Sequence, residues 1–481
     1  MGQLAISGIR LINMINIATT LISQNISSLD LSDAVTDITQ AAALTPLRVA
    51  AAYNFPSNNG AGVKIGIVSL GGNWLHTDFD HSMSDLGLST LINSGNIHTV
   101  FVDGASPTFS PTSDYSQENT LDLYCVAAIA PKADITIYIG DVSTATTNAQ
   151  LIKIWADTLT AAITGGSDIV TMSYSLNEHY ITGLGLGNFL STPLALAETL
   201  GTVVLAASGD FGTTQSGPAV YTGVGYPASE PRVVAVGGTK LTVNYSTNAR
   251  LSETPQFNVS SFPTGYSSGG GVSTLFPVPS WQSGLNYQTN TITINTATHA
   301  TSNEIIGPVT ALSGRGVPDI SGPMNAYALW FNGSVMGVGG TSASTPIMAG
   351  LLARYISIKG SKLSTSTSIH SLLYSGDAAR YYDILGTPGN DSNADTIVSG
   401  TGPVYTVTGY STKSGWDPVT GLGSINDATA LYNTIFTPTG KYKSTAGNWA
   451  NINAVYIKTA SGWQPVANVW TKTTTGWKVA K

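Results

Sequence analysis

The feature that most constrains the fold is a series of short apolar runs rich in β-branched residues. They are apolar on both faces, which is typical of parallel strands buried between two layers rather than of half-exposed strands. Segments with helical character lie between them. This alternation predicts a doubly wound α/β sheet whose site lies at the carboxyl ends of the strands. The runs are GVKIGIVSLGG (62–72), ADITIYIG (133–140), SDIVTMSYS (167–175), GTVVLAASGD (201–210) and RVVAVGG (232–238), and the helical segments are NTLDLYCVAAIA (119–130), TLTAAITGG (158–166) and STPLALAETLG (191–201).

Charged side chains make up only 10% of the 481 residues, and the net charge is -7. This composition gives no basic surface for nucleic acid, and no apolar stretch is long enough to predict a membrane span. Few titratable groups also blunt unfolding in acid, although a Ser/Thr-rich extracellular surface would have the same composition. Cys125 is the only cysteine, which excludes an intrachain disulfide, and we expect it to be an inert core residue.

Three segments differ in pattern along the chain. Residues 1–44 contain an apolar stretch interrupted by polar residues, which predicts an amphipathic helix rather than a signal sequence. Pro46 disfavours a continuing helix, and the α/β pattern occupies 45–436. In 437–481, tryptophans recur every 14 residues, and VYIKTASGW (455–463) nearly repeats as VWTKTTTGW (469–477). The repeat predicts Thr-rich β-hairpins that serve either as a stabilising appendage or as an attachment module with exposed aromatic side chains.

A small hydroxyl side chain stands at the predicted start of a buried helix in VGGTSASTPIMAG (338–350). Ser342 follows two glycines and a threonine, and Pro346 is of the kind favoured in a first helical turn. Backbone N–H groups at a helix N-terminus stabilise negative charge, which suits a nucleophile whose substrate becomes an oxyanion. On this stretch alone an N-cap serine is the simpler interpretation.

A serine nucleophile needs a base. None of the six histidines lies in a glycine-rich helix start, and HTDFDH (76–81) is expected to be a solvated polar loop. Glu118 and Asp122 are four residues apart in DYSQENTLDLYCVAAIAP (114–131) and so share one helix face, although acidic residues favour the first turn of any helix. Asp210 follows a buried strand, where it could stay protonated and donate a hydrogen bond, or simply form a turn.

These stretches, in the order Glu–Asp, Asp, Ser, resemble the sedolisins, serine-carboxyl peptidases that share the subtilisin fold. TPLRVAAAYNFP (45–56), SSGGGVSTLFPVPSWQ (267–282) and GRGVPDISG (314–322) also match, so the resemblance spans about 45–436. It implies that Ser342 is the nucleophile, Glu118 the general base, Asp122 its orienting residue and Asp210 the donor of a proton in the oxyanion hole. A carboxylate still accepts a proton in acid where an imidazole is already charged, which implies an acidic optimum.

The resemblance also implies one structural calcium ion. Its ligands would be the carboxylates of Asp383 and Asp417 and the carbonyls of Ile384, Lys413 and Gly415, an all-oxygen shell that Ca²⁺ accepts.

The chain departs from the family pattern in three places. Only a short segment precedes the catalytic domain, where family members commonly carry a large propeptide that blocks the site. Ser69 stands where many members have a further glutamate, and Tyr174 stands where a tryptophan is common. GYSSG (265–269) fits a nucleophile-elbow pattern, but it lacks a buried strand before it and is interpreted as a loop lining the substrate cleft.

The prediction is therefore a monomeric, acid-acting endopeptidase that cleaves proteins or peptides through an acyl-enzyme, with the C-terminal repeats available for attachment. We expect it outside the cell or on a virion. Two other functions stay open: a His-dependent subtilisin-type hydrolase with a neutral-to-alkaline optimum, and a catalytically silent adhesin that displays the tryptophan repeats.

Overall fold

The computed structural model describes residues 16–17, 43–92, 94–213, 222–257, 266–295, 297–298, 300–363, 365–376, 378–394 and 404–436, together with six strands between 440 and 479. The chain divides into two compact units, Met1–Asn426 and Asp427–Lys481. No helix among the described residues combines the length and apolar character needed to cross a bilayer.

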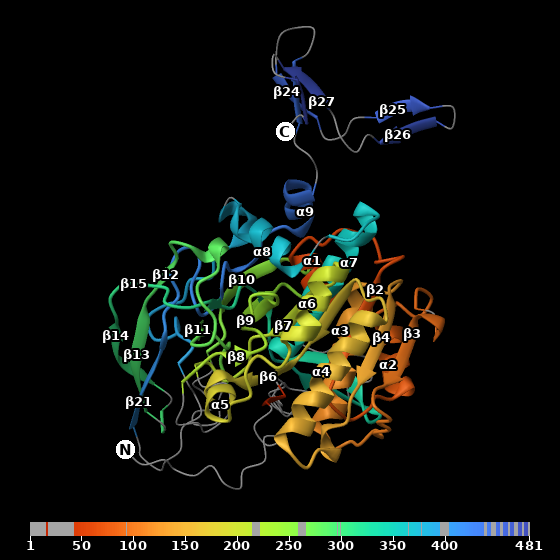
Figure 1. The fold of residues 1–481 in the computed structure, drawn as a ribbon. Helices are drawn as coiled ribbons and strands as arrows, with labels where there is room; N and C mark the ends of the chain where they lie inside the picture. The colour runs from red at the N-terminus through yellow and green to blue at the C-terminus, as the bar shows by residue number, and fades with distance from the viewer. Residues whose placement is uncertain are drawn as a thin grey trace. The chain divides into compact units, whose positions relative to one another are not determined.

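An eight-stranded sheet forms the centre of the first unit (Figure 1). Its strands run in the order β10-β9-β7-β5-β2-β4-β3, with β17 paired to β9, and every pairing is parallel except that of β9 with β10. The alternating arrangement confirms the doubly wound α/β prediction. The strands are β2 (Lys64–Ser69), β3 (Ile97–Phe101), β4 (Asp134–Ile139), β5 (Ile169–Met172), β7 (Val203–Ala207), β9 (Val234–Val243), β10 (Arg250–Pro255) and β17 (Ile320–Pro323).

Helices cover both faces of this sheet. On one face, Trp155 of α4 and Leu194 of α6 join Val68, Val170 and Val204 in one buried core cluster. Side chains alternate along a strand, so Ile67 and Leu205 point to the other face, where α3 packs against α7 and α7 packs on β5 and β7. The helices are α1 (Pro46–Ala52), α2 (His76–Asp85), α3 (Asp114–Ile129), α4 (Asn148–Thr164), α5 (Glu178–Gly183), α6 (Ser191–Leu200), α7 (Thr341–Lys359) and α8 (Ser366–Tyr374), with 3₁₀ turns at Ser94–Asn96, Val142–Thr144, Ser280–Gln282 and Ala378–Arg380.

The close approach of α3 and α7 depends on Gly350. A Cβ atom there would lie 2.6 Å from the Cβ of Ile129, nearer than packed side chains allow. The glycine therefore lets α7, which carries Ser342, lie directly on α3, which carries Glu118 and Asp122.

Smaller sheets surround the central one. A three-stranded sheet of β14-β13-β21 has its own small apolar cluster around Ile292 and Ile294. The remaining strands pair as β1-β6-β8, β11-β16, β12-β15, β18-β19 and β20-β22. Their bounds are β1 (Asn16–Ile17), β6 (Tyr174–Asn177), β8 (Gly225–Tyr226), β11 (Gly271–Val272), β12 (Asn286–Tyr287), β13 (Thr289–Asn295), β14 (Thr301–Ile306), β15 (Thr310–Ala311), β16 (Gly316–Val317), β18 (Tyr327–Phe331), β19 (Ser334–Val338), β20 (Tyr381–Tyr382), β21 (Val404–Tyr410) and β22 (Ser424–Ile425).

Most of the helix predicted in residues 1–44 lies outside the described residues. Asn16–Ile17 form strand β1, which pairs antiparallel with Tyr174 and Ser175 of β6, so the helix prediction is wrong at these two positions. The edge of β6 offers backbone hydrogen bonds to these two residues, and the local residue pattern holds no information about that distant edge.

The prediction of a solvated loop at 76–81 is also wrong. These residues form the first turns of α2, where Phe79 and Met83 are buried one turn apart and hold the helix to the body of the unit. Asp78 is buried as well, and its carboxylate accepts hydrogen bonds from the backbone N–H groups of Asn332 and Gly333 at 2.6 and 3.0 Å.

The second unit begins with helix α9 (Ala428–Phe436). Its six described strands form three antiparallel pairs at successive positions of the 14-residue repeat. The side chains of the repeat tryptophans lie outside the described residues. The strands are β23 (Gly440–Lys443), β24 (Trp449–Ile452), β25 (Tyr456–Thr459), β26 (Gly462–Pro465), β27 (Trp470–Thr473) and β28 (Gly476–Val479).

Candidate active site

Ser342 is the second residue of α7 and is fully buried. The preceding Gly340 has φ 120°, a conformation that favours glycine and turns the chain sharply into the helix. Pro346 lies in the second turn rather than the first, and because it has no N–H it cannot donate to the Ser342 carbonyl. The Ser342 backbone N–H lies in the first turn, where no intrahelical acceptor is available. This arrangement offers a donor beside the hydroxyl.

Glu118 and Asp122 lie in the second and third turns of α3 and are 0% and 1% exposed. Burial and the charge of Asp122 raise the pKa of Glu118 well above its usual value, whereas the hydroxyl groups of Ser342 and Ser173 lower it. Burial raises the pKa of Asp122 to about 8, against the hydrogen bonds from Ser173 and Glu118. Ser342 thus lies near the carboxyl pair, although its Oγ has no hydrogen-bond partner among the described residues, and two such acids titrate as a pair.

Asp210 lies beyond the carboxyl end of β7 and is 1% exposed. Its Oδ1 accepts two hydrogen bonds of 2.8 Å, from the backbone N–H and the hydroxyl of Thr341. Its charge also raises the pKa of Glu118, which places it in the same cluster. Since Oδ1 already accepts two donors, a proton on this carboxyl belongs on Oδ2, from which it can be donated to a ligand.

Thr341 and Ser173 are site residues that the sequence analysis did not identify. Thr341 directly precedes Ser342, and its hydroxyl also accepts a hydrogen bond of 3.2 Å from the N–H of Gly209. Ser173 follows β5 and donates a hydrogen bond of 2.8 Å to Asp122 Oδ1. A signal for Ser173 was available, because a polar residue at the carboxyl end of a buried strand lies at the edge where α/β sites form.

The segment 266–270 forms one wall beside Asp210. The N–H of Ser267 donates to the Asp210 carbonyl at 2.8 Å, and the N–H of Gly269 donates to the Gly209 carbonyl at 2.7 Å. No helix or strand element covers the described part of GYSSG, as expected for a loop. A pocket of about 280 Å³ adjoins this wall and is lined by uncharged residues: Thr213, Thr222, Gly223, Val224, Gly270, Gly271, Val272, Thr274, Thr289, Thr408, Gly409 and Tyr410.

Ser69 and Tyr174, the two positions that depart from the family pattern, contact each other. Ser69 Oγ lies 3.3 Å from the Tyr174 hydroxyl and donates to the Gly71 carbonyl at 2.9 Å. Burial, and next the charge of Glu118, raise the pKa of Tyr174. Two hydroxyl groups thus lie beside the carboxyl pair at the place where the family resemblance implies a third acid.

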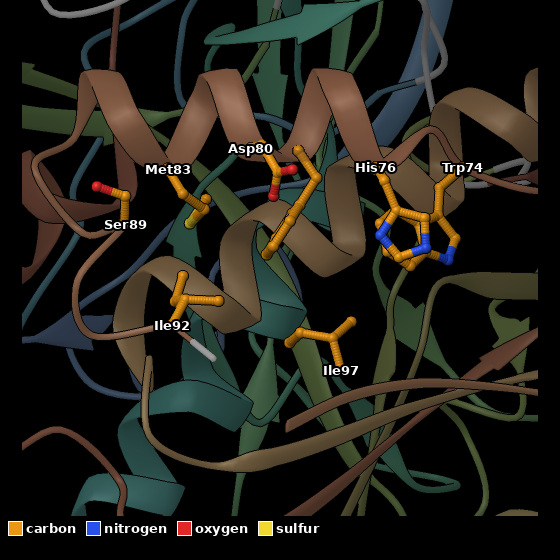
Figure 2. A pocket seen from close by; sticks show the side chains of 8 residues that line it. Trp74, His76, Asp80, Met83, Ser89, Ile92 and Ile97 are labelled. Carbon is orange, nitrogen blue, oxygen red and sulfur yellow. The ribbon is translucent and has the colours of Figure 1, made fainter. Parts of the chain in front are cut away.

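Five histidines lie in other contacts. The ring of His76 lies 4.1 Å from that of Trp74, tilted by 50°, in a small pocket between α2 and β3 (Figure 2). His81 packs against Trp330, His98 pairs with Asp134 at 3.0 Å, and His179 packs edge-on against Tyr180. The fifth, His370, belongs to the cluster described next, and His299 lies outside the described residues.

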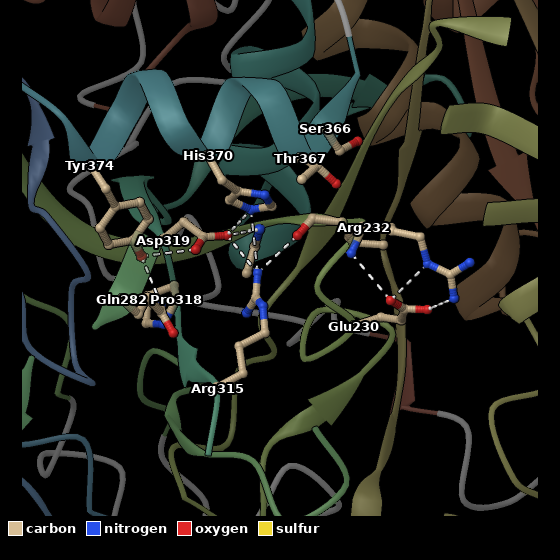
Figure 3. A network of polar contacts seen from close by, with 12 residues as sticks. Glu230, Arg232, Gln282, Arg315, Pro318, Asp319, Ser366, Thr367, His370 and Tyr374 are labelled. Carbon is tan, nitrogen blue, oxygen red and sulfur yellow. Dashed lines mark hydrogen bonds and ion pairs between the residues drawn. The ribbon is translucent and has the colours of Figure 1, made fainter. Parts of the chain in front are cut away.

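A second buried acidic cluster surrounds Asp319 (Figure 3). Asp319 Oδ2 lies 2.7 Å from the Arg315 guanidinium and 2.9 Å from His370 Nε2, and Oδ1 accepts a hydrogen bond of 2.9 Å from the Tyr374 hydroxyl. Burial opposes ionisation, but the charges of Arg315 and His370 prevail and lower the pKa of Asp319 to about 2. This carboxylate is satisfied within the protein and has a structural character.

The five residues expected to bind calcium lie in two neighbouring loops. Asp383 Oδ2 accepts from the N–H of Gly415 at 3.2 Å, and Asp417 Oδ2 accepts from the N–H of Lys413 at 3.1 Å. Asp417 is fully buried, and none of the ion pairs among the described residues includes it. Among the described residues, no group of three acidic, His or Cys side chains is arranged to hold a metal ion, so a cation here would depend on carbonyl ligands such as that of Ile384.

Comparisons with known proteins agree with this geometry. Residues 60–379 match the model of the subtilase family. Kumamolisin from Bacillus sp. (strain MN-32) is 33% identical over 392 residues, which cover 79% of this chain and 62% of kumamolisin. Tripeptidyl-peptidase 1 from Bos taurus is 30% identical over 276 residues, which cover 56% of this chain and 43% of that protein.

A solved structure shares the fold. Pseudomonas sedolisin, a serine-carboxyl proteinase, has a TM-score of 0.60 and 24% identity over 81% of this chain and 97% of that chain. The present chain spans about 62% of kumamolisin and less than half of tripeptidyl-peptidase 1. By its matched domain and its subtilisin-like sheet, the chain belongs to the subtilase family, in the group that resembles sedolisin and kumamolisin.

Proposed function

We propose that this chain is an acid-acting serine-carboxyl endopeptidase. The observation that carries the proposal is a buried carboxyl pair in which the Ser342 hydroxyl, at the N-terminus of a helix, lowers the pKa of Glu118. An imidazole is not needed as a base there, and the five histidines described above lie in other contacts.

Ser342 Oγ attacks the carbonyl carbon of the scissile peptide bond while Glu118 accepts the hydroxyl proton. Asp122 holds Glu118 in place. The oxyanion receives hydrogen bonds from the Ser342 N–H and from protonated Asp210 Oδ2. Glu118 then gives its proton to the leaving amine, and a water molecule hydrolyses the acyl-enzyme by the same steps in reverse order.

Acid pH suits both acidic sites. Asp210 must carry a proton to donate to the oxyanion, and the carboxyl pair must hold one proton so that the other carboxyl is free to act as base. A pair of interacting carboxyls loses its protons in two steps, and the singly protonated form lies between them. We therefore expect a bell-shaped pH profile, in which the acid limb marks the first deprotonation of the pair and the alkaline limb marks the loss of the remaining protons.

Strand β6 supports a peptide as the substrate. Its edge at Tyr174–Ser175 accepts β1 as an antiparallel strand, directly after Ser173, which contacts the carboxyl pair. An extended substrate that takes the place of β1 on this edge would bind through backbone hydrogen bonds, which need no particular side chain. The pocket beside Asp210 has no charged lining residue among those described and suits a small uncharged substrate side chain.

We also propose one structural calcium ion held by Asp383, Asp417 and the carbonyls of Ile384, Lys413 and Gly415. A buried carboxylate without a cationic partner is costly, and burial raises the pKa of Asp417 to about 7. A hard divalent cation would supply the missing charge and takes no part in the chemistry.

Further expectations stay proposals of the same kind. The 14-residue repeats serve for attachment to a surface or another protein, the protein is monomeric, and it works outside the cell or on a virion. The assigned segments are 1–44, 45–436 and 437–481.

Digestion of casein by the purified chain, from strongly acidic to mildly alkaline pH, tests the function. We expect cleavage in acid that Ser342→Ala abolishes. Retained cleavage by that variant would remove Ser342 from the mechanism, and a neutral optimum would favour the His-dependent hydrolase. No cleavage by the wild-type chain, together with no reaction with a serine-reactive label, would favour the silent adhesin.

A further inference from the structure

Ser173 touches both members of the carboxyl pair. It lies between β5 and β6, is fully buried, and donates a hydrogen bond of 2.8 Å from its hydroxyl to Asp122 Oδ1. The same hydroxyl also lowers the pKa of Glu118. It is therefore placed to stabilise negative charge on the pair.

Few other titratable groups face this pair. Asp210 beyond β7 and Tyr174 on β6 face Glu118, and Cys125 lies one turn further along α3. Charged groups on the other packed helices lie elsewhere.

The charge of Arg48 in α1 lowers the pKa of Tyr124, and the charge of Asp85 in α2 raises it. Arg354 of α7 bonds the Ile129 carbonyl at the far end of α3 at 2.6 Å. Ser173 thus offers the pair an uncharged hydrogen-bond donor. No cation has been described next to these two acids.

We propose that Ser173 is a positioning residue that stabilises the singly ionised form of the carboxyl pair, the form in which one carboxyl is free to act as the base. Oδ1 of Asp122 already accepts the Ser173 hydroxyl, so a proton held by Asp122 belongs on Oδ2. Thr341 occupies Oδ1 of Asp210 in the same way, with two donors. This inference rests on the proposed function.

The test measures kcat and KM against pH for Ser173→Ala and Ser173→Thr, using a peptide that the wild-type chain cleaves. A hydrogen bond to an ionised carboxyl lowers its pKa, so its loss raises the pKa of the first titration step. The acid limb of the kcat profile of Ser173→Ala should move up by about one pH unit, because the ionised carboxyl then loses a hydrogen-bond donor. KM should stay near its wild-type value, and Ser173→Thr should restore the limb.

Thr171→Val is the matched control. Thr171 lies two residues earlier on β5 and is also fully buried, and its Oγ1 has no hydrogen-bond partner among the described residues. Its pH profile should match the wild type. Ser173→Cys keeps the volume with a weaker donor and should give an upward shift smaller than that of alanine, which provides a second measurement if the alanine variant does not fold.

The outcomes separate the two ideas. If wild-type protein cleaves in acid but the acid limb does not move in Ser173→Ala or Ser173→Cys, the role of Ser173 is wrong and the function stands. An equal shift in Thr171→Val would also overturn it, because the effect would then be structural. If the wild-type chain does not cleave in acid, the function fails first and the inference fails with it.

Discussion

Two groups of buried residues in the first unit contain carboxyls whose pKa values are shifted in opposite directions. Glu118 and Asp122 lie together with hydroxyl groups as neighbours, and burial raises the pKa of both. Asp319 is equally buried, but it contacts Arg315 and His370, and its pKa is lowered to about 2. Burial is common to the two clusters, so the difference lies in the neighbours.

This contrast separates a reactive acid from a structural one. A buried carboxyl without a cation keeps a proton that it can exchange during a reaction, whereas a carboxyl paired with a guanidinium stays ionised and fixes the packing around it. An enzyme that works in acid can use both kinds. Acids that titrate serve at the active site, and an ion pair that stays ionised in acid stabilises the surrounding fold.

The largest effect should come from removing the base in the reactive cluster. Glu118→Ala should lower kcat by about 10³-fold or more, because general base catalysis and the contact with Ser342 are lost together. Asp210→Asn keeps a hydrogen-bond donor in place and should weaken catalysis less. Steady-state kinetics at the acid optimum checks the ranking, and the opposite order would mean that the two acids have been assigned the wrong roles.

The next largest effect should come from the structural cluster. Asp319→Asn leaves the buried Arg315 without its partner, and breaking one side of a buried ion pair typically costs about 3–5 kcal/mol of unfolding free energy. Urea unfolding at pH 5 measures it, and activity per folded molecule should be unchanged.

Asp157→Asn is the surface control for that experiment. Asp157 pairs with the exposed Lys153 on α4, and exposed pairs contribute little to stability. Equal destabilisation by the two variants would show that burial of the ion pair is not what matters.

The sheet could be predicted from the sequence because its central strands are short runs of apolar residues. The run at 201–210 contains β7 and the run at 133–140 contains β4, both buried between helices as their two apolar faces indicate. The two errors have a common cause. At 76–81 the helix is held by tertiary contacts of Phe79 and Met83, and at Asn16–Ile17 a strand forms on a distant edge, so neither is written in the local pattern.

The candidate site was predictable in part for the same reason. Glu118 and Asp122 share a helix face by spacing alone, and the resemblance supplied Ser342 and Asp210. Thr341 and Ser173 were missed because single hydroxyl groups are frequent in this chain. Only the fold shows that these two lie 2.8 Å from a carboxyl of the candidate site.

Asp417 is a third case that sharpens the comparison. It is buried like the acids of both clusters, its Oδ1 accepts hydrogen bonds from the N–H groups of Val419 and Thr420, and its pKa is raised to about 7. If a calcium ion supplies to Asp417 the positive charge that Arg315 supplies to Asp319, removal of the ion by a chelator should lower the free energy of unfolding by about 2–4 kcal/mol. Calorimetry with and without a chelator measures it. In Asp383→Asn the chelator effect should shrink, whereas an unchanged melting temperature in the wild type would remove the calcium site.

The smallest effect is a pH-dependent change in stability at Asp122. Its folded pKa is about 8, above the usual value for aspartate, so between about pH 4 and 8 the folded protein holds a proton that the unfolded chain has released. Stability from this group is complete below about pH 4 and is lost as the pH rises towards 8. Asp122→Asn cannot ionise, so it should be more stable than the wild type at pH 7, by about 1–2 kcal/mol after allowance for its coupling to Glu118, and equal to it at pH 4.

Asp319→Asn should show the opposite dependence, with its deficit complete above about pH 4 and shrinking as the pH falls through 2, because the ion pair itself is then protonated. If the clusters differ as described, the gap between the melting temperatures of the two variants should therefore widen as the pH rises from 2 to 8, and a constant gap would show that they do not differ.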